Sequence, residues 1–188
     1  MARAGLADAV GVDPTRRRAG VMNLFTYGRS VTHTMQTMKN VDNAFEAWWT
    51  PYQAKIGSDP LMKFFNSQRN ALLKEGELVT VNSTFIKHLD GAMIAAINQH
   101  APPGTVGTLF GDQLGGNGWE VAMPDGSTQK VYFALPADFG VESTLHFPDP
   151  PAVHDGKPVV DTSIGNVGGL FIDSLSKIVD EFIERFGF

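Results

Sequence analysis

The chain has 188 residues, of which 43% are hydrophobic and 19% are charged, and its formal net charge is −5. A chain of this length can bury one sizeable core, roughly 70% of its unfolded surface. It has no cysteine, which excludes disulfides, thiolate nucleophiles and cysteine-ligated metals. The negative charge argues against a general nucleic-acid coat. No apolar run approaches the roughly 20 residues that span a bilayer, and we expect a cytoplasmic protein with no membrane partner.

The first 18 residues predict a flexible N-terminal arm with at most one helical turn, over Leu6 to Val10. It ends in Arg16-Arg17-Arg18, the one tight basic cluster of the chain. A cluster of this length is most often a solvated hinge before a helix, which is the interpretation we favour over nucleic-acid contact.

A helical pattern of apolar residues begins near residue 19 and continues to Ile56. We predict two helices that separate near Asn40, because Asn40 and Asp42 can cap a helix; one long helix is the alternative. Gly28 lies on the apolar face and is expected to allow close approach of another helix. Of the adjacent Trp48 and Trp49, only one is expected to face the core.

The best-specified helix covers residues 60–75. Asp59 can accept N–H groups of its first turn, Pro60 suits the first helical position, and Gly76 can end it in the left-handed conformation. Its apolar face contains Leu61, Phe64, Phe65 and Leu72, spaced as one side of a helix.

Strand patterns then follow at residues 78–86, 106–110, 118–123, 130–135 and 141–147, with a hairpin signal at residues 124–127. We predict one small antiparallel sheet of four or five strands. Residues 148–160 are proline-rich and predict an irregular connection to a final helix, which Asp161 or Thr162 would cap. Glycines 165, 168 and 169 predict tight packing of that helix.

The predicted fold is therefore α+β. A helical bundle is built from residues 19–76 and 161–186, and a small antiparallel β-sheet is inserted before the C-terminal helix. Residues 19–188 would form a single domain, with residues 77–160 as the inserted β subdomain.

The segment Phe64 to Lys74 resembles the motif helix of the HEPN superfamily, small helical proteins that include RNA-cleaving toxins and defence nucleases. The resemblance lies in Arg69-Asn70 followed by Lys74, where the family has an Arg, often followed by Asn, and then a His. Residues 45–49, 72–76, 110–112 and 115–121 are also similar to a group of uncharacterised bacterial proteins, a similarity that spans most of residues 20–186.

The HEPN resemblance implies that Arg and His side chains of two protomers meet across a dimer interface and cleave RNA without a metal ion. A guanidinium can hold a phosphate with two hydrogen bonds, and an imidazole can move protons at neutral pH. Lys74 departs from this pattern, because an ammonium group can hold phosphate but is protonated at neutral pH. Asn70 and Lys74 share a helix face, whereas Arg69 and Lys74 lie roughly 140° apart.

Three functional hypotheses follow. The first is a HEPN-like, non-catalytic module, expected to be a homo-oligomer, that dimerises or binds a protein or RNA through Arg69, Asn70 and Lys74. The second is a metal-independent RNase in which Arg69 binds the scissile phosphate and Lys74 replaces the His. The third is a binding protein that acts through its sheet and the glycine-rich loop 111–118. An Arg69 that is buried and paired with an acidic residue such as Glu46 would instead be structural.

No cofactor or metal is predicted. His146 and His154 are close in sequence, but their spacing matches no metal template, and we expect them to be exposed or hydrogen-bonded. The glycine-rich loop precedes a strand and not a helix, so turns are the expected structure. The sequence contains no recognisable serine nucleophile elbow, Walker loop or pair of catalytic carboxylates.

Overall fold

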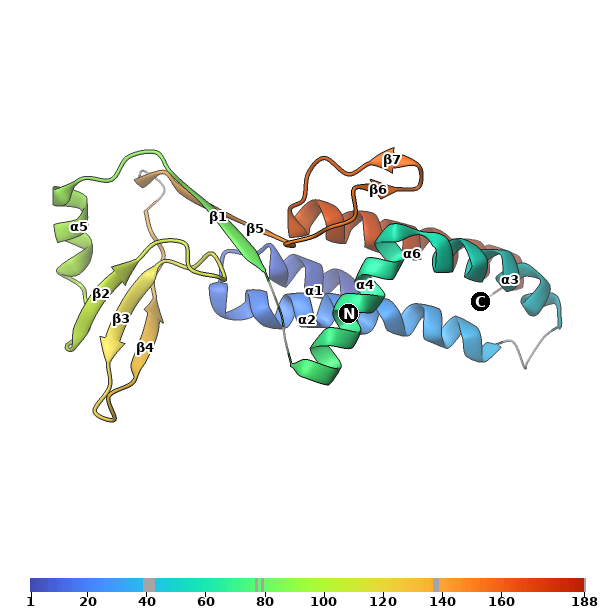
Figure 1. The fold of residues 1–188 in the computed structure, drawn as a ribbon, viewed down its shortest axis with the longest axis horizontal. Helices are drawn as coiled ribbons and strands as arrows, with labels where there is room; N and C mark the ends of the chain where they lie inside the picture. The colour runs from blue at the N-terminus through green and yellow to red at the C-terminus, as the bar shows by residue number, and fades with distance from the viewer. Residues whose placement is uncertain (39–42, 77, 79, 137–138, 188) are drawn as a thin grey trace. The chain divides into compact units, whose positions relative to one another are not determined.

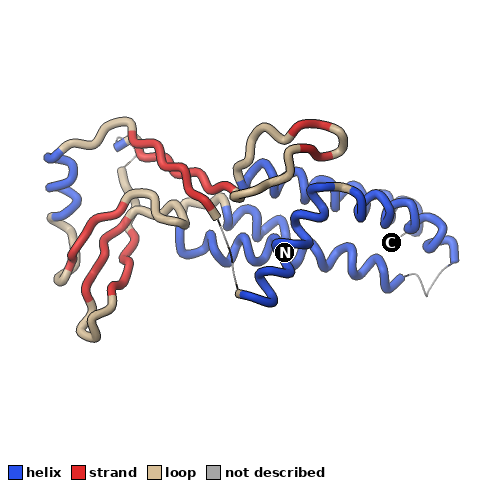
Figure 2. The backbone as a smooth tube through the Cα atoms, viewed as in Figure 1, coloured by secondary structure: helices blue, strands red, loops and turns tan. Residues whose placement is uncertain are grey.

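The computed structural model describes residues 1–38, 43–76, 78, 80–136 and 139–187. The fold is α+β, as predicted, and the strands precede the C-terminal helix (Figures 1 and 2). The elements are α1 (Ala2–Ala9), α2 (Pro14–Thr37), α3 (Asn43–Ser58), α4 (Pro60–Glu75), β1 (Val81–Ile86), α5 (Gly91–Asn98), β2 (Thr105–Leu109), β3 (Gly118–Ala122), β4 (Thr128–Tyr132), β5 (Val141–His146), β6 (Val153–His154), β7 (Lys157–Pro158) and α6 (Ile164–Phe186).

The chain divides into two compact units. The helical unit contains Met1–Gly11, Arg16–Val79 and Phe147–Phe188, and the β unit contains Val12–Thr15 and Thr80–His146. The β unit is therefore shorter than the inserted subdomain predicted over residues 77–160. The β6–β7 hairpin, although made of strands, belongs to the helical unit.

The N-terminal segment is a packed helix, which differs from the flexible arm that we predicted. Gly5 and Ala9 of α1 are buried, and a Cβ atom on Gly20 of α2 would clash with the backbone of Ala9. Arg17 also departs from the expected solvated cluster, because it is buried and donates its Nε–H to the Gly11 carbonyl at 2.7 Å. Small residues thus let α1 lie directly against α2.

Two helices, α2 and α3, cover the pattern that began near residue 19. The predicted caps, Asn40 and Asp42, lie outside the described residues. Gly28 allows a close approach as predicted, since the Phe171 ring of α6 occupies the space of its missing side chain. The expectation for the tryptophan pair is wrong, because Trp48 and Trp49 are both buried, in a cluster with Phe45.

Helix α4 has the predicted ends. The Asp59 carboxylate accepts the Met62 N–H at 3.0 Å, and Gly76 ends the helix at φ 69°. On the buried side, the Phe65 ring stacks on Phe171 with the ring centroids 3.8 Å apart. The stack joins α4 to α6 and holds both helices in one core.

Helix α6 buries the predicted apolar face. Its cap is Ser163, whose Oγ accepts the Asn166 N–H at 3.2 Å, and not Asp161 or Thr162. Gly168 packs tightly, as expected, with its missing Cβ position 2.7 Å from Leu6. Gly169 faces open space, and the prediction of tight packing does not hold there.

The strands form separate small sheets where we predicted one. In the β unit, β1 pairs with β5, and β2, β3 and β4 form a second antiparallel sheet in that order. The predicted hairpin joins β3 to β4, with Gly126 at φ 84°. Residues 91–98 of the β unit form helix α5. In the helical unit, β6 and β7 add a hairpin to the connection predicted as irregular.

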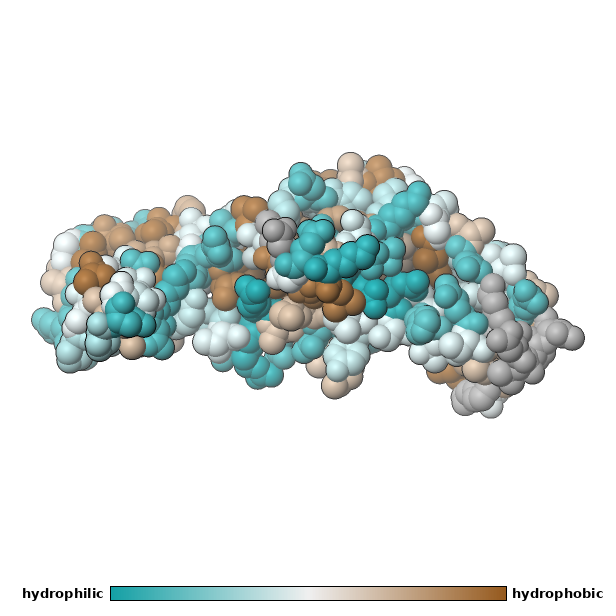
Figure 3. Space-filling view, turned by 60° about the horizontal axis from the view of Figure 1, so that its bottom comes forward, coloured by the Kyte–Doolittle hydropathy of each residue, from teal (hydrophilic) through white to brown (hydrophobic). Residues whose placement is uncertain are grey.

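The surface is mixed in polarity. Figure 3 shows one face on which hydrophilic side chains predominate and hydrophobic ones form small separate patches. None of the described helices is both long and apolar enough to cross a membrane.

Candidate functional site

The three predicted site residues lie near the C-terminal end of α4. Arg69 is half-buried and donates from Nη1 to the Asn70 side-chain oxygen at 3.1 Å. Its Nε is buried without a hydrogen-bond partner among the described residues. No ion pair to Glu46 is present, so the structural role that we considered for Arg69 lacks its partner. Lys74 is exposed.

Asn70 and Lys74 belong to a longer row of side chains, which we call the α4 polar face. It consists of Lys63, Asn66, Asn70 and Lys74, spaced three, four and four residues apart, so that they lie on one side of the helix. Lys63, Asn66 and Lys74 are exposed, and Asn70 is half-buried. Lys63 and Asn66 are not among the residues predicted from the sequence, although the helical spacing that joins Asn70 to Lys74 also joins them to this face.

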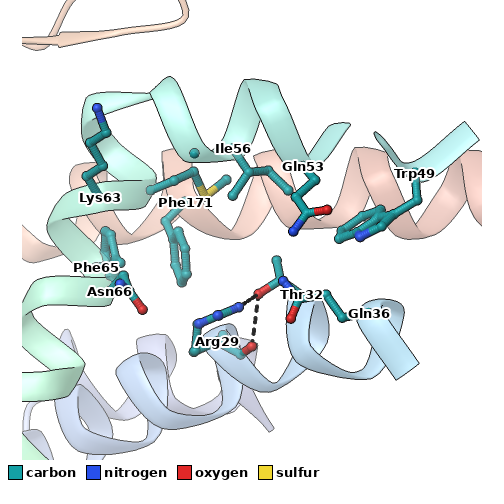
Figure 4. A pocket seen from close by; sticks show the side chains of 13 residues that line it. Arg29, Thr32, Gln36, Trp49, Gln53, Ile56, Lys63, Phe65, Asn66 and Phe171 are labelled. Atoms are coloured by element: carbon teal, nitrogen blue, oxygen red, sulfur yellow. Dashed lines mark hydrogen bonds between the residues drawn. The ribbon is translucent and has the colours of Figure 1, made fainter. Parts of the chain in front are cut away.

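A cavity of about 270 Å³ adjoins the first half of this face. We call it the Arg29 cavity, and Figure 4 shows its lining side chains. It is formed within the helical unit by Gly28, Arg29, Thr32 and Gln36 of α2, by Trp49, Gln53, Ile56 and Gly57 of α3, by Met62, Lys63, Phe65 and Asn66 of α4, and by Phe171 of α6.

The Arg29 cavity contains several hydrogen-bond donors. The indole N–H of Trp49 is buried without a partner among the described residues and faces the side of the cavity where Thr32 and Gln36 lie (Figure 4). Arg29 donates to the Thr32 hydroxyl, and Lys63 sits at the rim with its ammonium group pointing outward (Figure 4).

These groups define the ligand that the cavity can hold. The indole and guanidinium groups only donate hydrogen bonds, as does the Lys63 ammonium outside the rim, whereas the amides of Gln36, Gln53 and Asn66 can also accept them. None of the described lining residues is acidic. A buried donor without a partner costs free energy that an acceptor on a ligand would recover. The lining therefore suits a molecule rich in acceptor oxygens, such as a phosphate or a carboxylate.

The glycine-rich loop 111–118 forms turns, as predicted. Asp112 closes the loop: its Oδ1 accepts the N–H groups of Leu114 and Gly116, and its Oδ2 accepts from Lys130 and Tyr132 at 2.8 and 2.7 Å. The donors of the loop and of neighbouring β4 thus bind a carboxylate of the chain itself. Among the described residues, no group of three or more histidine, aspartate or glutamate side chains could hold a metal ion.

A family model described as bacteriophage lambda protein ea47 matches residues 7–102. The chain belongs to the ea47 family. The ea47 match includes α2, α3 and α4 in full, and with them the whole α4 polar face, Arg29 and Trp49. Helix α6 lies outside it. No curated protein and no solved structure matches the chain.

Proposed function

We propose that this ea47-family protein is a HEPN-like, non-catalytic module that binds RNA through the α4 polar face and the Arg29 cavity. One observation carries the proposal: the face and the cavity present lysine, arginine, indole N–H and amide groups, and none of the described residues that form them is acidic. RNA presents phosphate oxygens, which are acceptors with negative charge, and such a ligand matches this set of groups.

The length of the face supports binding to a chain of phosphates. Lys63 and Lys74 are eleven residues apart on α4, which corresponds to roughly 16 Å along a helix axis. Asn70 also orients the guanidinium of Arg69 beside this row. Because the whole chain carries a net charge of −5, we expect RNA to bind at this local group of cations and not over the general surface.

The absence of a proton acceptor supports a non-catalytic role. The α4 polar face contains lysine and asparagine but no histidine or carboxylate. Lys74 is exposed, and an ammonium group has no lone pair with which to take the proton of a ribose hydroxyl. The HEPN resemblance also leads us to expect a homodimer, acting in the cytoplasm.

Binding of a fluorescent single-stranded RNA of mixed sequence tests this function. We expect the double variant Lys63→Gln, Lys74→Gln to raise the dissociation constant about 10-fold or more, because two phosphate contacts are lost. The control is Lys87→Gln, Lys157→Gln, which removes the same charge from two exposed lysines that are not part of the α4 polar face. Equal effects of the two double variants would contradict the assignment.

The same samples distinguish the alternative functions. RNA incubated with the protein in EDTA should stay intact, and the oligomeric state of each sample should be that of a dimer. Cleavage that depends on Arg69 and Lys74 would instead support the RNase hypothesis. RNA binding by a monomer would contradict the proposed dimer but would not contradict the proposed RNA-binding face.

A further inference from the structure

A second cavity of the helical unit contains a serine, a histidine and an aspartate that are linked by hydrogen bonds. The cavity measures about 140 Å³ and is separate in composition from the α4 polar face. It is lined by Tyr52, Lys55, Ile56, Asp59, Met62, His154, Asp155, Ser174, Lys177, Ile178 and Glu181. Three of these side chains, Asp59, His154 and Ser174, form a continuous hydrogen-bonded row.

The distances in this row are those of ordinary hydrogen bonds. His154 Nδ1 lies 3.1 Å from Asp59 Oδ2, and His154 Nε2 lies 2.9 Å from Ser174 Oγ. The side chains of His154 and Asp59 are only 13% and 10% exposed. The imidazole is thus bridged between a carboxylate and a hydroxyl, largely out of water.

The cap of α4 holds the carboxylate in place. Asp59 uses Oδ1 to accept the Met62 N–H at 3.0 Å, which fixes the orientation of the carboxyl group. The N-terminus of a helix also favours negative charge. Because an ionised carboxylate only accepts hydrogen bonds, a neutral His154 turns its Nδ1–H toward Asp59 and presents the lone pair of Nε2 to Ser174.

We propose that Ser174 is a nucleophile activated by His154 and oriented by Asp59, in a site that hydrolyses short-chain acyl esters. The hydrogen-bond order is that of a serine–histidine–aspartate triad. The cavity volume and the apolar Ile56, Met62 and Ile178 limit the acyl group to a few carbons. This inference does not rest on RNA binding: the two cavities share only Ile56 and Met62, and Asp59, His154 and Ser174 line the second one alone.

The reaction balances without a further reactant except water. Ser174 Oγ bonds to the ester carbonyl carbon while its proton passes to His154 Nε2; the C–O bond to the alcohol then breaks, and that proton leaves with the alcohol. Water attacks the acyl-serine, gives a proton to Nε2, and the acid departs as Ser174 recovers its proton.

Three neighbouring groups bear on this step. The Ser174 hydroxyl also lies 2.9 Å from the Leu170 carbonyl, so its single proton must turn from that carbonyl to Nε2. Lys177 lines the same cavity three residues further along α6, on the same side as Ser174, and supplies a cation for the charge on the carbonyl oxygen. Lys55 is held at 3.1 Å by Asp155.

Covalent labelling with a fluorophosphonate tests the nucleophile directly. We expect the intact protein to gain one label, which peptide mass spectrometry locates on Ser174, and Ser174→Ala to gain none. Ser176→Ala is the matched control, because Ser176 lies on the same helix and also donates to a backbone carbonyl. Absence of label, or a label on another residue, would overturn the proposal.

Hydrolysis of p-nitrophenyl acetate tests the other two roles. His154→Gln should lower the Ser174-dependent rate about 100-fold or more. Asp59→Asn should lower it comparably, although asparagine caps a helix as well as aspartate, so the fold is kept. Rates that equal wild type in either variant, with unfolding midpoints unchanged, would show that the row is a structural link between the β6–β7 hairpin and helices α4 and α6.

Discussion

At the scale of single residues, local hydrogen bonds shift the pKa of several side chains. In the β unit, Asp112 is one of them. Burial of its carboxyl group raises the pKa, but hydrogen bonds from Lys130, Tyr132 and two backbone N–H groups have the larger combined effect and lower it. The side chain is only 7% exposed. Ionised Asp112 therefore holds the loop 111–118 against β4.

A lowered pKa makes the contribution of Asp112 depend on pH. The stabilisation is present above the ordinary aspartate pKa, near ~3.9, and is lost as the pH falls through the lowered folded-state value. We expect Asp112→Asn to reduce the free energy of unfolding by roughly 2 kcal/mol at pH 7, because hydrogen bonds to a charged acceptor are lost. Urea unfolding at pH 7 and below pH 3 measures this. A difference between variant and wild type that persists unchanged at the acid pH would contradict the explanation.

Tyr52 gives the corresponding test at alkaline pH. A hydrogen bond to Glu181, together with burial and the charge of Glu181, raises the pKa of Tyr52 to about 12. Stabilisation from this pair is present below the ordinary tyrosine pKa, near ~10, and is lost as the pH rises through about 12.

The Tyr52 prediction is measured by absorbance titration of tyrosinate. Glu181→Gln should return one tyrosine to the ordinary range, whereas Tyr132, whose pKa burial and Asp112 raise to about 12, should be unchanged. An unaltered titration curve in Glu181→Gln would mean that the hydrogen bond is not the cause.

At the scale of elements, the packing of the helical unit depends on positions where a glycine lets two helices come close together. The ring of Phe171 lies over Gly28 of α2 and stacks on Phe65 of α4, so one side chain of α6 fixes two other helices. Gly169, two residues earlier on α6, has no atom within 4 Å of the position that a Cβ would occupy.

This contrast predicts opposite effects of the same substitution. Gly28→Ala should destabilise the protein by roughly 1–2 kcal/mol, because overpacking against Phe171 outweighs a gain in helix propensity of up to about 1 kcal/mol. Gly169→Ala should stabilise it by up to about 1 kcal/mol, since only the propensity changes. Thermal and urea unfolding of both variants measure these changes in the free energy of unfolding. Stabilisation by Gly28→Ala would show that the ring moves aside at no cost.

At the scale of the whole molecule, a net charge of −5 coexists with a local group of cations. Arg29, Lys63, Arg69 and Lys74 lie on or beside the proposed RNA-binding face. If all four neutralise phosphates of a single strand, the logarithm of the binding constant should fall with the logarithm of salt concentration at a slope of about −3.

Titrations between about 50 and 200 mM salt measure this slope. The double variant Lys63→Gln, Lys74→Gln should make it shallower by about 1.4, because two counterion-releasing contacts are removed. A wild-type slope near zero would show that RNA binding, if present, does not depend on phosphate contacts. The proposed face would then be wrong.

Local patterns predicted much of the fold. The ends of α4 depend on Asp59, Pro60 and Gly76, whose preferences act within one helical turn, and the β3–β4 hairpin depends on four adjacent residues. The separate sheets could not be predicted in this way. β1 pairs with β5, and Val81 lies opposite His146, so this pairing depends on residues far apart in the chain.

The candidate sites show the same contrast between local sequence patterns and contacts between distant residues. By itself the sequence determined that Asn70 and Lys74 share a helix face, because the period of the helix places residues four apart together. Only the tertiary structure added Arg29 and Trp49, which come from two other helices, and only it brought His154 to Asp59, 95 residues earlier in the chain. Helical periodicity is a property of neighbouring residues, whereas a cavity forms where separate elements pack, and that packing is decided by the core as a whole.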